Sequence, residues 1–495
     1  MHTMKVLAIT LWVLLFFILT NTNFVVCVGI CRENEQRALE SLKKEVDDPS
    51  DLLSSWVVGN NCCEWEGVVC NNLTHHVIEL HMHEQFSYDG SNYPRINSLE
   101  WLLSLLSIEY LEMYSVDLSK ATNWLQVINM LPSLVDLSLV YCNLNHIQPL
   151  LHHNFSSLET LDLSWNNFSS PVPEWVFNLA NLVSLHLSGS NFIGQFSQGP
   201  VNLTSLTTLK ASGNSFNCLL PRWLFDLSNL EHIELTRSGN EGTIPSMCGN
   251  ITKLKYLDLS ENNLNSTIPN WLYRCKGLES IALGDNMLSG KLPDVIGKLG
   301  KLELLDLSLN LFEEEVYDLF NGRSNFVSAE MGNSSSLSYL SLENNKLTGT
   351  LPKSTLELPM LKYFFITNNR LEGVVTESHF SKLRQLLVFS ASRNKLTLKL
   401  ITNVDILDGG IQGEVPTWFW DLSSEIAHLN LSHNQFVGEV PIISAPSRGL
   451  SNFLCEAKNG PYSLYYLNLE GNKLSEEIPD CWMNWPVVSF NLEGE

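Results

Sequence analysis

The chain is poor in basic residues and in charged residues of any kind. Of its 495 residues, 30 are Lys or Arg and 53 are Asp or Glu, and charged residues make up only 17% of the total. The formal net charge of -23 argues against nucleic acid as a partner, because surfaces that bind nucleic acid are basic. A basic ligand, or a basic patch on another protein, fits this charge better through electrostatic steering.

Long apolar runs are missing after the first residues of the chain. At the N-terminus, Lys5 precedes the apolar run Val6–Leu19, and Gly29 offers a small residue at a plausible cleavage point. This pattern predicts a secretory signal peptide over residues 1–29 and export to the cell surface or the extracellular space. The alternative is a signal-anchor that stays in the membrane, but the run is short for a span of about 20 residues. No later stretch is long and apolar enough to cross a bilayer.

Motifs of catalysis and of cofactor binding are also missing. The sequence has no phosphate-binding glycine loop, no kinase signature and no Ser/His/Asp arrangement. The four closely spaced histidines His75, His76, His81 and His83 are the best candidates for a metal site. We identify no Cys or carboxylate that completes a ligand set with them, so surface histidines are the favoured interpretation. We therefore expect no enzyme activity, no cofactor and no metal.

What the chain does have is one leucine every 24 residues over its central part. From Leu254 the repeated phrase reads L-K-Y-L-D-L-S-E-N-N-L-N-S-T-I-P. A period in the twenties with L-x-x-L-x-L-x-x-N is the signature of a leucine-rich-repeat solenoid. We predict an α/β fold, a right-handed horseshoe solenoid with a concave parallel β-sheet. The leucines that open the phrase at this spacing are Leu158, Leu182, Leu206, Leu230, Leu254, Leu278 and Leu302.

Each repeat also carries an asparagine eight residues after its opening leucine. In the strand, the leucines point inward and the residues between them point to the concave face. An asparagine where the chain leaves the strand can satisfy backbone groups that stacked coils would otherwise bury unpaired. Cys142, Ser190 and Ser238 replace it in three coils. The ladder comprises Asn166, Asn214, Asn262, Asn286, Asn310, Asn345, Asn369, Asn394, Asn434 and Asn472.

A second phrase, L-x-G-x-[IVL]-P, follows the asparagine in many repeats. It occurs as Leu288–Pro293, Leu347–Pro352 and Phe436–Pro441, and it resembles the plant-specific class of extracellular leucine-rich repeats. Two later segments, Pro416–Ser424 and Ile478–Pro486, look like parts of plant receptor-like proteins. Members of that family have an extracellular repeat array, one transmembrane helix and a short tail without a kinase. The resemblance implies that output passes through a partner receptor kinase.

The segment before the repeats resembles the N-terminal cap of plant leucine-rich-repeat receptors and of polygalacturonase-inhibiting proteins. We predict a cap over residues 30–76, because the end of a solenoid exposes apolar surface that needs covering. Residues 34–46 read as an amphipathic helix, and Trp56 and Trp65 add bulk. The helix residues expected to face inward are Ala38, Leu39, Leu42 and Val46.

Eleven cysteines agree with an oxidising compartment, in which disulfides can form. Spacing alone does not select among the possible connectivities. The resemblance to plant receptor caps implies the pairs Cys31–Cys62 and Cys63–Cys70. Late in the chain, Cys455 and Cys481 form either a bridge between coils or two free thiols.

The repeat array is predicted over residues 77–495, with irregular spacing in three places. Leu302 and Leu337 are too far apart for one ordinary coil, and we expect a longer loop to contain the extra residues. After Leu386 a strand start at Ile401 follows too early, and the segment from Ile426 to Leu464 is too long for one coil. The array is expected to be irregular after residue 386. It ends at residue 495 within an expected strand that begins near Val487, which we interpret as a truncation.

Recognition is expected to use exposed strand positions of the concave face, with aromatic rings as anchors and a central strip of carboxylates. The candidate binding residues are Trp165, His186, Lys210, Glu234, Arg237, Tyr256, Asp258, Glu261, Asp285, Asp306, Tyr339 and Tyr363. Eight N-x-S/T sequons are candidate glycosylation sites, and several fall in the same phase of the repeat. They are Asn72, Asn154, Asn167, Asn202, Asn250, Asn265, Asn333 and Asn430.

Three functions remain open on the sequence. The first is an extracellular receptor-like protein in defence or development. It would bind a peptide, protein or glycan and signal through a partner kinase. Its membrane anchor would lie only in a missing C-terminal part. The second is a secreted inhibitor similar to polygalacturonase-inhibiting proteins, or a non-functional truncated copy. The third is a hydrolase that would lose its activity on Asp258→Asn or Glu261→Gln.

Overall fold

The structure is a computed structural model whose chain divides into unit 1, Met1–Cys142, and unit 2, Asn143–Glu495. The predictions on the signal peptide 1–29, Asn250, Asn333, Cys455 and Cys481 lie outside the described residues. Among the residues described, no helix has the length and apolar character that a membrane span requires. Described are residues 30–83, 93–150, 152–197, 201–246, 251–291, 299–316, 336–351, 358–376, 379, 383, 385–398, 427–430, 432–434, 437–439, 465–468, 470–475 and 489–491.

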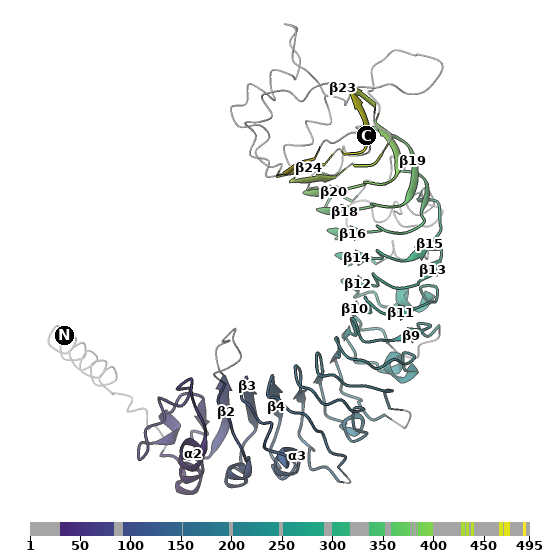
Figure 1. The fold of residues 1–495 in the computed structure, drawn as a ribbon. Helices are drawn as coiled ribbons and strands as arrows, with labels where there is room; N and C mark the ends of the chain where they lie inside the picture. The colour runs from purple at the N-terminus through teal and green to yellow at the C-terminus, as the bar shows by residue number, and fades with distance from the viewer. Residues whose placement is uncertain are drawn as a thin grey trace, which may run out of the picture. The chain divides into compact units, whose positions relative to one another are not determined.

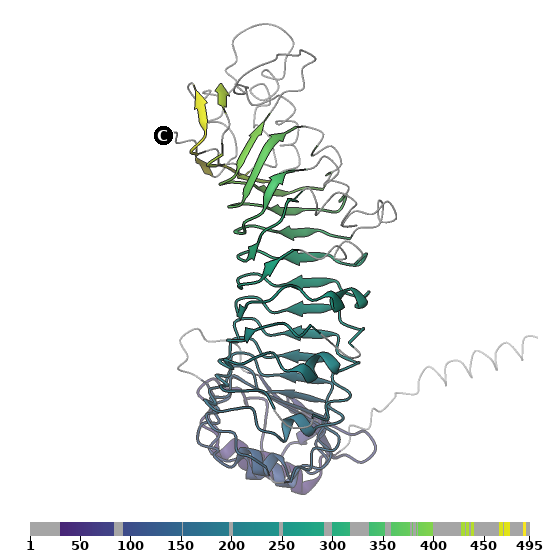
Figure 2. The same ribbon diagram turned by 90° about the vertical axis from the view of Figure 1, so that its right-hand side faces the viewer.

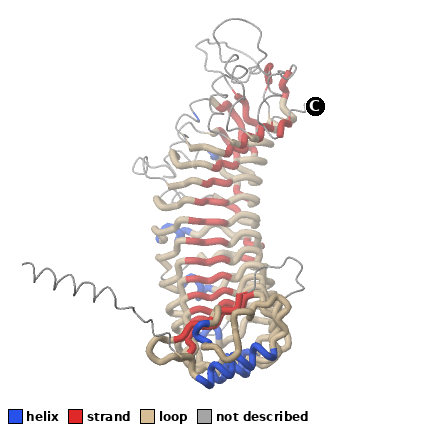
Figure 3. The backbone as a smooth tube through the Cα atoms, turned by 90° about the vertical axis from the view of Figure 1, so that its left-hand side faces the viewer, coloured by secondary structure: helices blue, strands red, loops and turns tan. Residues whose placement is uncertain are grey.

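Unit 1 combines a helical cap with the first strands of a parallel sheet (Figures 1 and 3). Strand β1 pairs antiparallel with β2, and β2, β3 and β4 then pair in parallel. The short β1 therefore covers the outer edge of β2, which would otherwise expose unpaired backbone groups. The elements are α2 (Glu33–Glu45), η1 (Cys62–Glu64), β1 (Val68–Cys70), β2 (Val77–His83), η2 (Glu100–Ser104), β3 (Tyr110–Tyr114), α3 (Trp124–Ile128) and β4 (Asp136–Val140).

Helix α2 confirms the predicted amphipathic helix, with one difference at its end. Ala38, Leu39 and Leu42 are buried as expected, whereas Val46 follows the last helical residue and is only half-buried. The sequence did not indicate that Glu35 would be buried on the same face. Its carboxylate accepts the backbone N–H of Val77 at 2.8 Å, so it ties the helix to the first residue of β2. Buried carboxylates of this kind need such partners to offset lost hydration.

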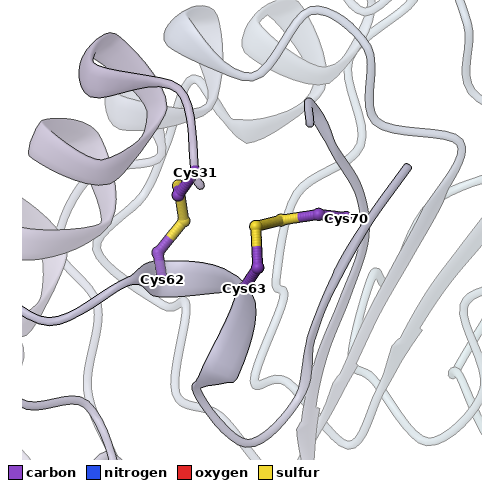
Figure 4. A group of neighbouring side chains, drawn as sticks. All are labelled: Cys31, Cys62, Cys63 and Cys70. Atoms are coloured by element: carbon purple, nitrogen blue, oxygen red, sulfur yellow. A yellow bond between two sulfur atoms is a disulfide. The ribbon is translucent and has the colours of Figure 1, made fainter. Parts of the chain in front are cut away.

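Two disulfides staple the cap, and their pairing is the one that the resemblance implied (Figure 4). Cys31 is bonded to Cys62 and Cys63 to Cys70, each with Cα atoms 5.5 Å apart. Nearby, the buried rings of Trp56 and Trp65 stack with centroids 5.1 Å apart.

Unit 2 is built from short coils that each add one strand to a parallel sheet (Figures 1 and 2). In Figure 1 the small strand pairs β9–β11 and β13–β15 lie on the side of the coils opposite β10, β12 and β14. The sheet contains β5 (Thr160–Asp162), β6 (Ser184–His186), β7 (Thr208–Lys210), β8 (His232–Glu234), β10 (Tyr256–Asp258), β12 (Ser280–Ala282), β14 (Leu304–Asp306), β16 (Tyr339–Ser341), β18 (Tyr363–Phe365), β20 (Val388–Ser390), β22 (His428–Asn430), β24 (Tyr466–Asn468) and β26 (Ser489–Asn491).

The opposite side of unit 2 carries shorter elements. Three one-turn helices precede the next strand in their coils, and the remaining strands form small parallel groups. These elements are η3 (Val176–Asn178), η4 (Arg222–Asp226), η5 (Asn270–Arg274), β9 (Glu241–Gly242), β11 (Asn263–Leu264), β13 (Ser289–Gly290), β15 (Leu311–Phe312), β17 (Thr348–Thr350), β19 (Arg370–Val375), β21 (Lys395–Leu398), β23 (Val437–Glu439) and β25 (Lys473–Ser475).

The core of unit 2 follows the leucine pattern. In the first coil Leu158, Leu161 and Leu163 are buried, while Thr160 and Asp162 stand half-buried on the sheet face, as predicted. Aromatic rings fill the rest of the core, with tight pairs such as Phe168–Phe192, Phe177–Trp223 and Phe196–Phe216. The coils therefore share one continuous apolar interior, in which each coil buries the face of the next.

The asparagine ladder forms the predicted network of hydrogen bonds. Asn310 Nδ2 donates to the carbonyls of Leu283 at 2.9 Å and of Ser308 at 2.8 Å. Its Oδ1 accepts the N–H of Leu288 at 2.9 Å. Asn310 thus joins two adjacent coils at a buried point of the backbone. Where serine replaces asparagine, Ser238 Oγ still donates to the Ala211 carbonyl of the preceding coil at 2.9 Å.

The irregular spacings leave the sheet continuous in unit 2. Across the first one, Leu304 of β14 pairs with Tyr339 of β16, as expected for a single longer coil. The strand start predicted at Ile401 is wrong as part of the sheet, because β20 pairs directly with β22; Ile401 itself lies outside the described residues. The ladder agrees, since Asn434 Oδ1 accepts from Leu396 N in the preceding coil. β24 likewise pairs with β22 and with β26, the strand expected near Val487.

Candidate ligand-binding face

The sheet face of unit 2 presents two columns of side chains, one from the first residue and one from the third residue of each strand. The register is unbroken, so Thr208, His232 and Tyr256 stand side by side in the first column, and their third-position neighbours do the same. Of the predicted binding residues, this face holds His186, Lys210, Glu234, Tyr256, Asp258, Asp306, Tyr339 and Tyr363 in these columns.

Four predicted binding residues lie just beyond the strands rather than within them. Trp165, Arg237, Glu261 and Asp285 have positive φ values of 60°, 49°, 52° and 52°. Each precedes a ladder position, where the left-handed conformation turns the chain away from the sheet. Their interpretation as strand positions was therefore wrong. The side chains stand along the edge where the strands end, beside the two columns.

Trp165 is the most exposed of the predicted aromatic anchors. The residue has 60% relative exposure, compared with 42% for Tyr256 and 38% for Tyr363. A Cβ on Gly189 of the next coil would lie only 2.7 Å from the Trp165 ring, so the absence of a side chain there allows the indole to rest on the backbone. This packing orients a large ring at the edge of the sheet face.

Two carboxylates of the predicted strip, Glu234 and Glu261, are paired with basic side chains of neighbouring coils. Glu234 lies 3.8 Å from Lys210 and 3.7 Å from His232. Glu261 contacts the guanidinium of Arg237. The Lys210 and Arg237 pairs join neighbouring coils, and they reduce the negative charge around β7, β8 and β10. His232 and Glu234 instead stand on the same strand, and burial lowers the pKa of His232 below its usual range. Exposed pairs of this kind contribute little to stability, about 0–1 kcal/mol each.

The aspartates of the L-D-L-S phrase have a local structural role. Asp162, Asp258 and Asp306 accept the backbone N–H two residues later at 2.9, 3.0 and 2.9 Å. Each therefore caps the turn that follows its strand, as short acidic side chains commonly do. Each carboxylate has a second oxygen that takes no part in this cap. In Asp162 that oxygen lies 3.3 Å from His186 Nδ1.

A group of side chains from β10 to β18 combines negative charge with aromatic rings; we name it the acidic–aromatic patch. The structure records no ion pair for its three carboxylates among the described residues. The Tyr339 and Tyr363 ring centroids lie 6.1 Å apart. Between these two rings and Tyr256, β12 presents the small side chains of Ser280 and Ala282, and β14 presents Leu304 and Asp306. The patch consists of Tyr256, Asp258, Asp306, Tyr339, Glu343 and Tyr363.

Glu343 is the most perturbed carboxyl of the patch. Partial burial, followed by the charge of Asp306, raises the pKa of Glu343 above its usual range. Burial and a neighbouring negative charge destabilise the ionised form of a carboxyl, and an approaching cation stabilises that form again. Glu343 and Asp306 therefore form a position at which a positively charged group would relieve repulsion.

The raised pKa of Glu343 predicts a pH-dependent effect of Glu343→Gln. Since the pKa is higher in the folded state than in the unfolded state, the ionised carboxylate costs stability once the pH rises above the unfolded value of about 4.3. The variant should therefore be more stable than the wild type at pH 7, and this gain should vanish below pH 4. Urea unfolding at both pH values measures the difference. A gain of equal size at both pH values would contradict the assignment.

The candidate glycosylation sites fall into two groups. Asn430 differs from the others because it lies within β22 on the sheet face, where its Oδ1 accepts from Ser432 N at 3.1 Å. Modification of the sequons stays a prediction. The exposed and described sequon asparagines are Asn72, Asn154, Asn167, Asn202 and Asn265.

In unit 1 the structure adds a carboxylate that the sequence analysis did not connect to the histidines. His81 of β2 pairs in register with Glu112 of β3, and His83 also contacts Glu112. The expectation that no carboxylate accompanies His81 and His83 was therefore wrong. Glu112 is distant in sequence, and only the register of two parallel strands brings it to them.

Comparison with known families agrees with the architecture. Residues 32–71 match the family described as Leucine rich repeat N-terminal domain. Residues 132–193 and 252–312 match the Leucine rich repeat family, and a second description of the same repeat matches 336–358 and 463–485. The chain contains a leucine-rich-repeat N-terminal domain and leucine-rich repeats. Its N-terminal cap and its repeats are the parts that these families describe.

Similar curated proteins are plant receptor-like proteins. "Receptor-like protein EIX1" of Solanum lycopersicum is 31% identical over 172 residues, which cover 33% of this chain and 17% of that protein. "Receptor-like protein 14" of Arabidopsis thaliana is 30% identical over 172 residues, covering 33% of this chain and 15% of that protein. The matched part of this chain thus spans less than a fifth of these relatives. The relation to polygalacturonase-inhibiting proteins stays a prediction.

Among solved structures, "Crystal structure of a TDR receptor" has a TM-score of 0.66 and 25% identity, and the match covers 86% of this chain and 70% of that one. The structure described as "Plant peptide hormone receptor RGFR1 in complex with RGF2" has a TM-score of 0.53 and 20% identity, covering 87% of this chain and 79% of that one. The second likeness concerns the fold alone.

Proposed function

We propose that this chain is an extracellular recognition protein that binds an extended, basic peptide segment on the sheet face of unit 2. The observation that carries the proposal is the acidic–aromatic patch. It unites Asp258, Asp306 and Glu343, which form no ion pair with any described residue, with the rings of Tyr339 and Tyr363. Aromatic anchors beside complementary charge are the usual basis of such recognition.

The dimensions of the patch suit a short linear ligand. It extends over the consecutive strands β10, β12, β14, β16 and β18. At about 4.8 Å between strands, four intervals span roughly 19 Å, which is the length of about six extended residues at about 3.3 Å each. A peptide lying across the strands would place Lys or Arg near Asp306 and Glu343 and apolar side chains near the tyrosines.

The relatives support a receptor-like role. The curated proteins in the comparison are receptor-like proteins, and one structure of similar fold is described as a TDR receptor. We propose that this chain passes its signal to a partner receptor kinase at the cell surface in defence or development. Co-purification with a receptor kinase from plant cells that express the tagged chain is expected. Recovery of the chain alone after ligand treatment would contradict this part.

The binding proposal is tested with a decapeptide of alternating Arg and Leu as the probe. Fluorescence anisotropy at 50 mM salt should detect binding to the wild-type chain, with weaker binding at 300 mM because the charges are screened. The double variant Asp306→Asn/Glu343→Gln should bind about tenfold more weakly, which corresponds to about 1.4 kcal/mol. A decapeptide of alternating Glu and Leu should not bind.

The matched control removes two carboxylates from elsewhere in unit 2. Glu241 of β9 and Glu315 beside β17 are exposed and belong to the small strand groups rather than to the sheet face. The variant Glu241→Gln/Glu315→Gln changes the net charge equally and should bind the Arg-Leu peptide like the wild type. Equal weakening in both double variants would mean that only net charge matters, and the proposed site would then be wrong.

A further inference from the structure

Two histidines and one glutamate converge on the sheet face of unit 1. His81 and His83 are two residues apart on β2, so both side chains stand on the same face. On the adjacent strand, Glu112 of β3 pairs in register with His81. Because both strands belong to one regular parallel pair, the backbone fixes the positions from which these three side chains start.

The potential ligand atoms are already close together. His81 Nδ1 lies 2.8 Å and His83 Nε2 lies 3.1 Å from the same Glu112 oxygen, Oε2. The ligand atoms of the three side chains all lie within 4.8 Å of one another. Around a tetrahedral zinc ion with bonds of about 2.0–2.1 Å, ligand atoms are about 3.3 Å apart. A small rotation of these side chains is therefore sufficient to surround an ion.

A fourth residue, Glu79, holds the first histidine in place. Its Oε2 lies 2.9 Å from His81 Nε2, the ring nitrogen that does not face Glu112. A carboxylate on the second nitrogen of a histidine is the usual outer partner in metal sites, because it fixes the tautomer and the orientation of the ring. The arrangement runs from Glu79 through His81 to the point shared with Glu112 and His83.

The backbone below the cluster is held tightly. The His81 N–H donates to the Gly67 carbonyl at 2.7 Å, in the segment that leads into β1. Gly67 has φ +78°, and a Cβ there would collide with the His81 carbonyl oxygen, so only glycine allows this approach. The side chains keep an open side, with relative exposures of 29% for His81, 31% for Glu112 and 56% for His83. An ion could reach them from solvent.

We propose that His81, His83 and Glu112 bind a divalent transition-metal ion, zinc by preference, with Glu79 as the residue that orients His81. Two imidazoles and one carboxylate suit zinc and its neighbours rather than calcium or magnesium, which prefer oxygen ligands. Three protein ligands leave one position of a tetrahedral ion for water or for a carboxylate or imidazole of a binding partner. The site would also join β2 to β3 beside the cap.

Isothermal titration calorimetry of the full chain with zinc chloride tests the proposal. The wild type should bind one ion per chain, and its thermal midpoint should rise on saturation. His83→Ala and Glu112→Gln should each weaken binding by more than about 100-fold. Glu79→Gln should weaken binding by about 10- to 100-fold, the range found for outer partners of metal ligands. X-ray absorption of the zinc-loaded chain should show two imidazole ligands.

The matched control is His186→Ala. His186 is also a half-buried histidine beside a carboxylate, Asp162, on a sheet face, but its contact involves one histidine only. This variant should bind zinc like the wild type. His83 is largely exposed, so His83→Ala is expected to fold, and an unchanged metal-free thermal midpoint checks this. Zinc binding that persists in both ligand variants, or no binding to the wild type at about 100 µM zinc, would overturn the proposal.

Discussion

Replacing Asn310 by leucine should lower the free energy of unfolding by about 3–5 kcal/mol, because the substitution keeps the volume and removes every hydrogen bond of the side chain. In this buried position the N–H of Leu288 would lose its acceptor. The carbonyls of Leu283 and Ser308 would each lose one hydrogen bond of about 0.5–1.5 kcal/mol, although Asn286 Nδ2 still donates to the first at 3.3 Å and the Asp285 N–H to the second at 3.0 Å. Each unsatisfied buried polar group costs about 1–3 kcal/mol. Urea unfolding measures the loss, and hydrogen exchange at Leu288 should show it locally.

Two variants bracket this prediction. Asn310→Ser should cost less than the leucine variant, because Ser190 and Ser238 keep carbonyl hydrogen bonds at the same ladder position. Asn263→Ala, at an exposed position two coils before Asn310, should change stability by less than about 0.5 kcal/mol. If Asn310→Leu is as stable as Asn263→Ala, the ladder does not hold the coils together.

Removal of the Cys31–Cys62 bond by a double alanine substitution should be the most damaging change in the cap. The bond closes a loop with a sequence separation of 31 residues, compared with 7 for Cys63–Cys70. Loop-closure entropy then gives losses of about 3.7 and about 2.5 kcal/mol in a chain-entropy description. Hydrogen exchange of residues 33–45 in the full chain should show both losses in this order.

The control for the cap is Cys218→Ala, which removes a buried free thiol of unit 2. It should leave exchange in α2 unchanged, because Cys218 belongs to the other unit. A reversed order of the two disulfide variants would indicate that packing of Trp56 and Trp65 around the bonds, rather than chain entropy, sets the stability of the cap.

The repeat made the strands and the ladder predictable from the sequence. Leucine spacing is a local signal, and the same local signal gave Asn310 its structural role. It failed at Ile401, where an apolar phrase resembled a strand start although β20 pairs directly with β22. Spacing alone does not distinguish a long coil from two irregular ones, because the choice depends on pairing across the coil.

Features of the candidate sites that join distant segments were not predictable in the same way. The contact of Glu112 with His83 joins residues 29 positions apart through the register of β2 and β3. The contact of Glu35 with Val77 joins the cap to the first repeat strand. The ion pair of Glu261 with Arg237 was not predictable either, because it depends on both residues lying at the edge where the strands end.

Hydrogen exchange of the full chain with and without the Arg-Leu decapeptide tests the central claim most directly. If the sheet face of unit 2 is the recognition surface, protection should increase at β14, β16 and β18, and it should be lost in Asp306→Asn/Glu343→Gln. Strands β9, β11, β13 and β15 on the opposite side should exchange as before. Protection confined to those outer strands, with none at β14 to β18, would contradict the account.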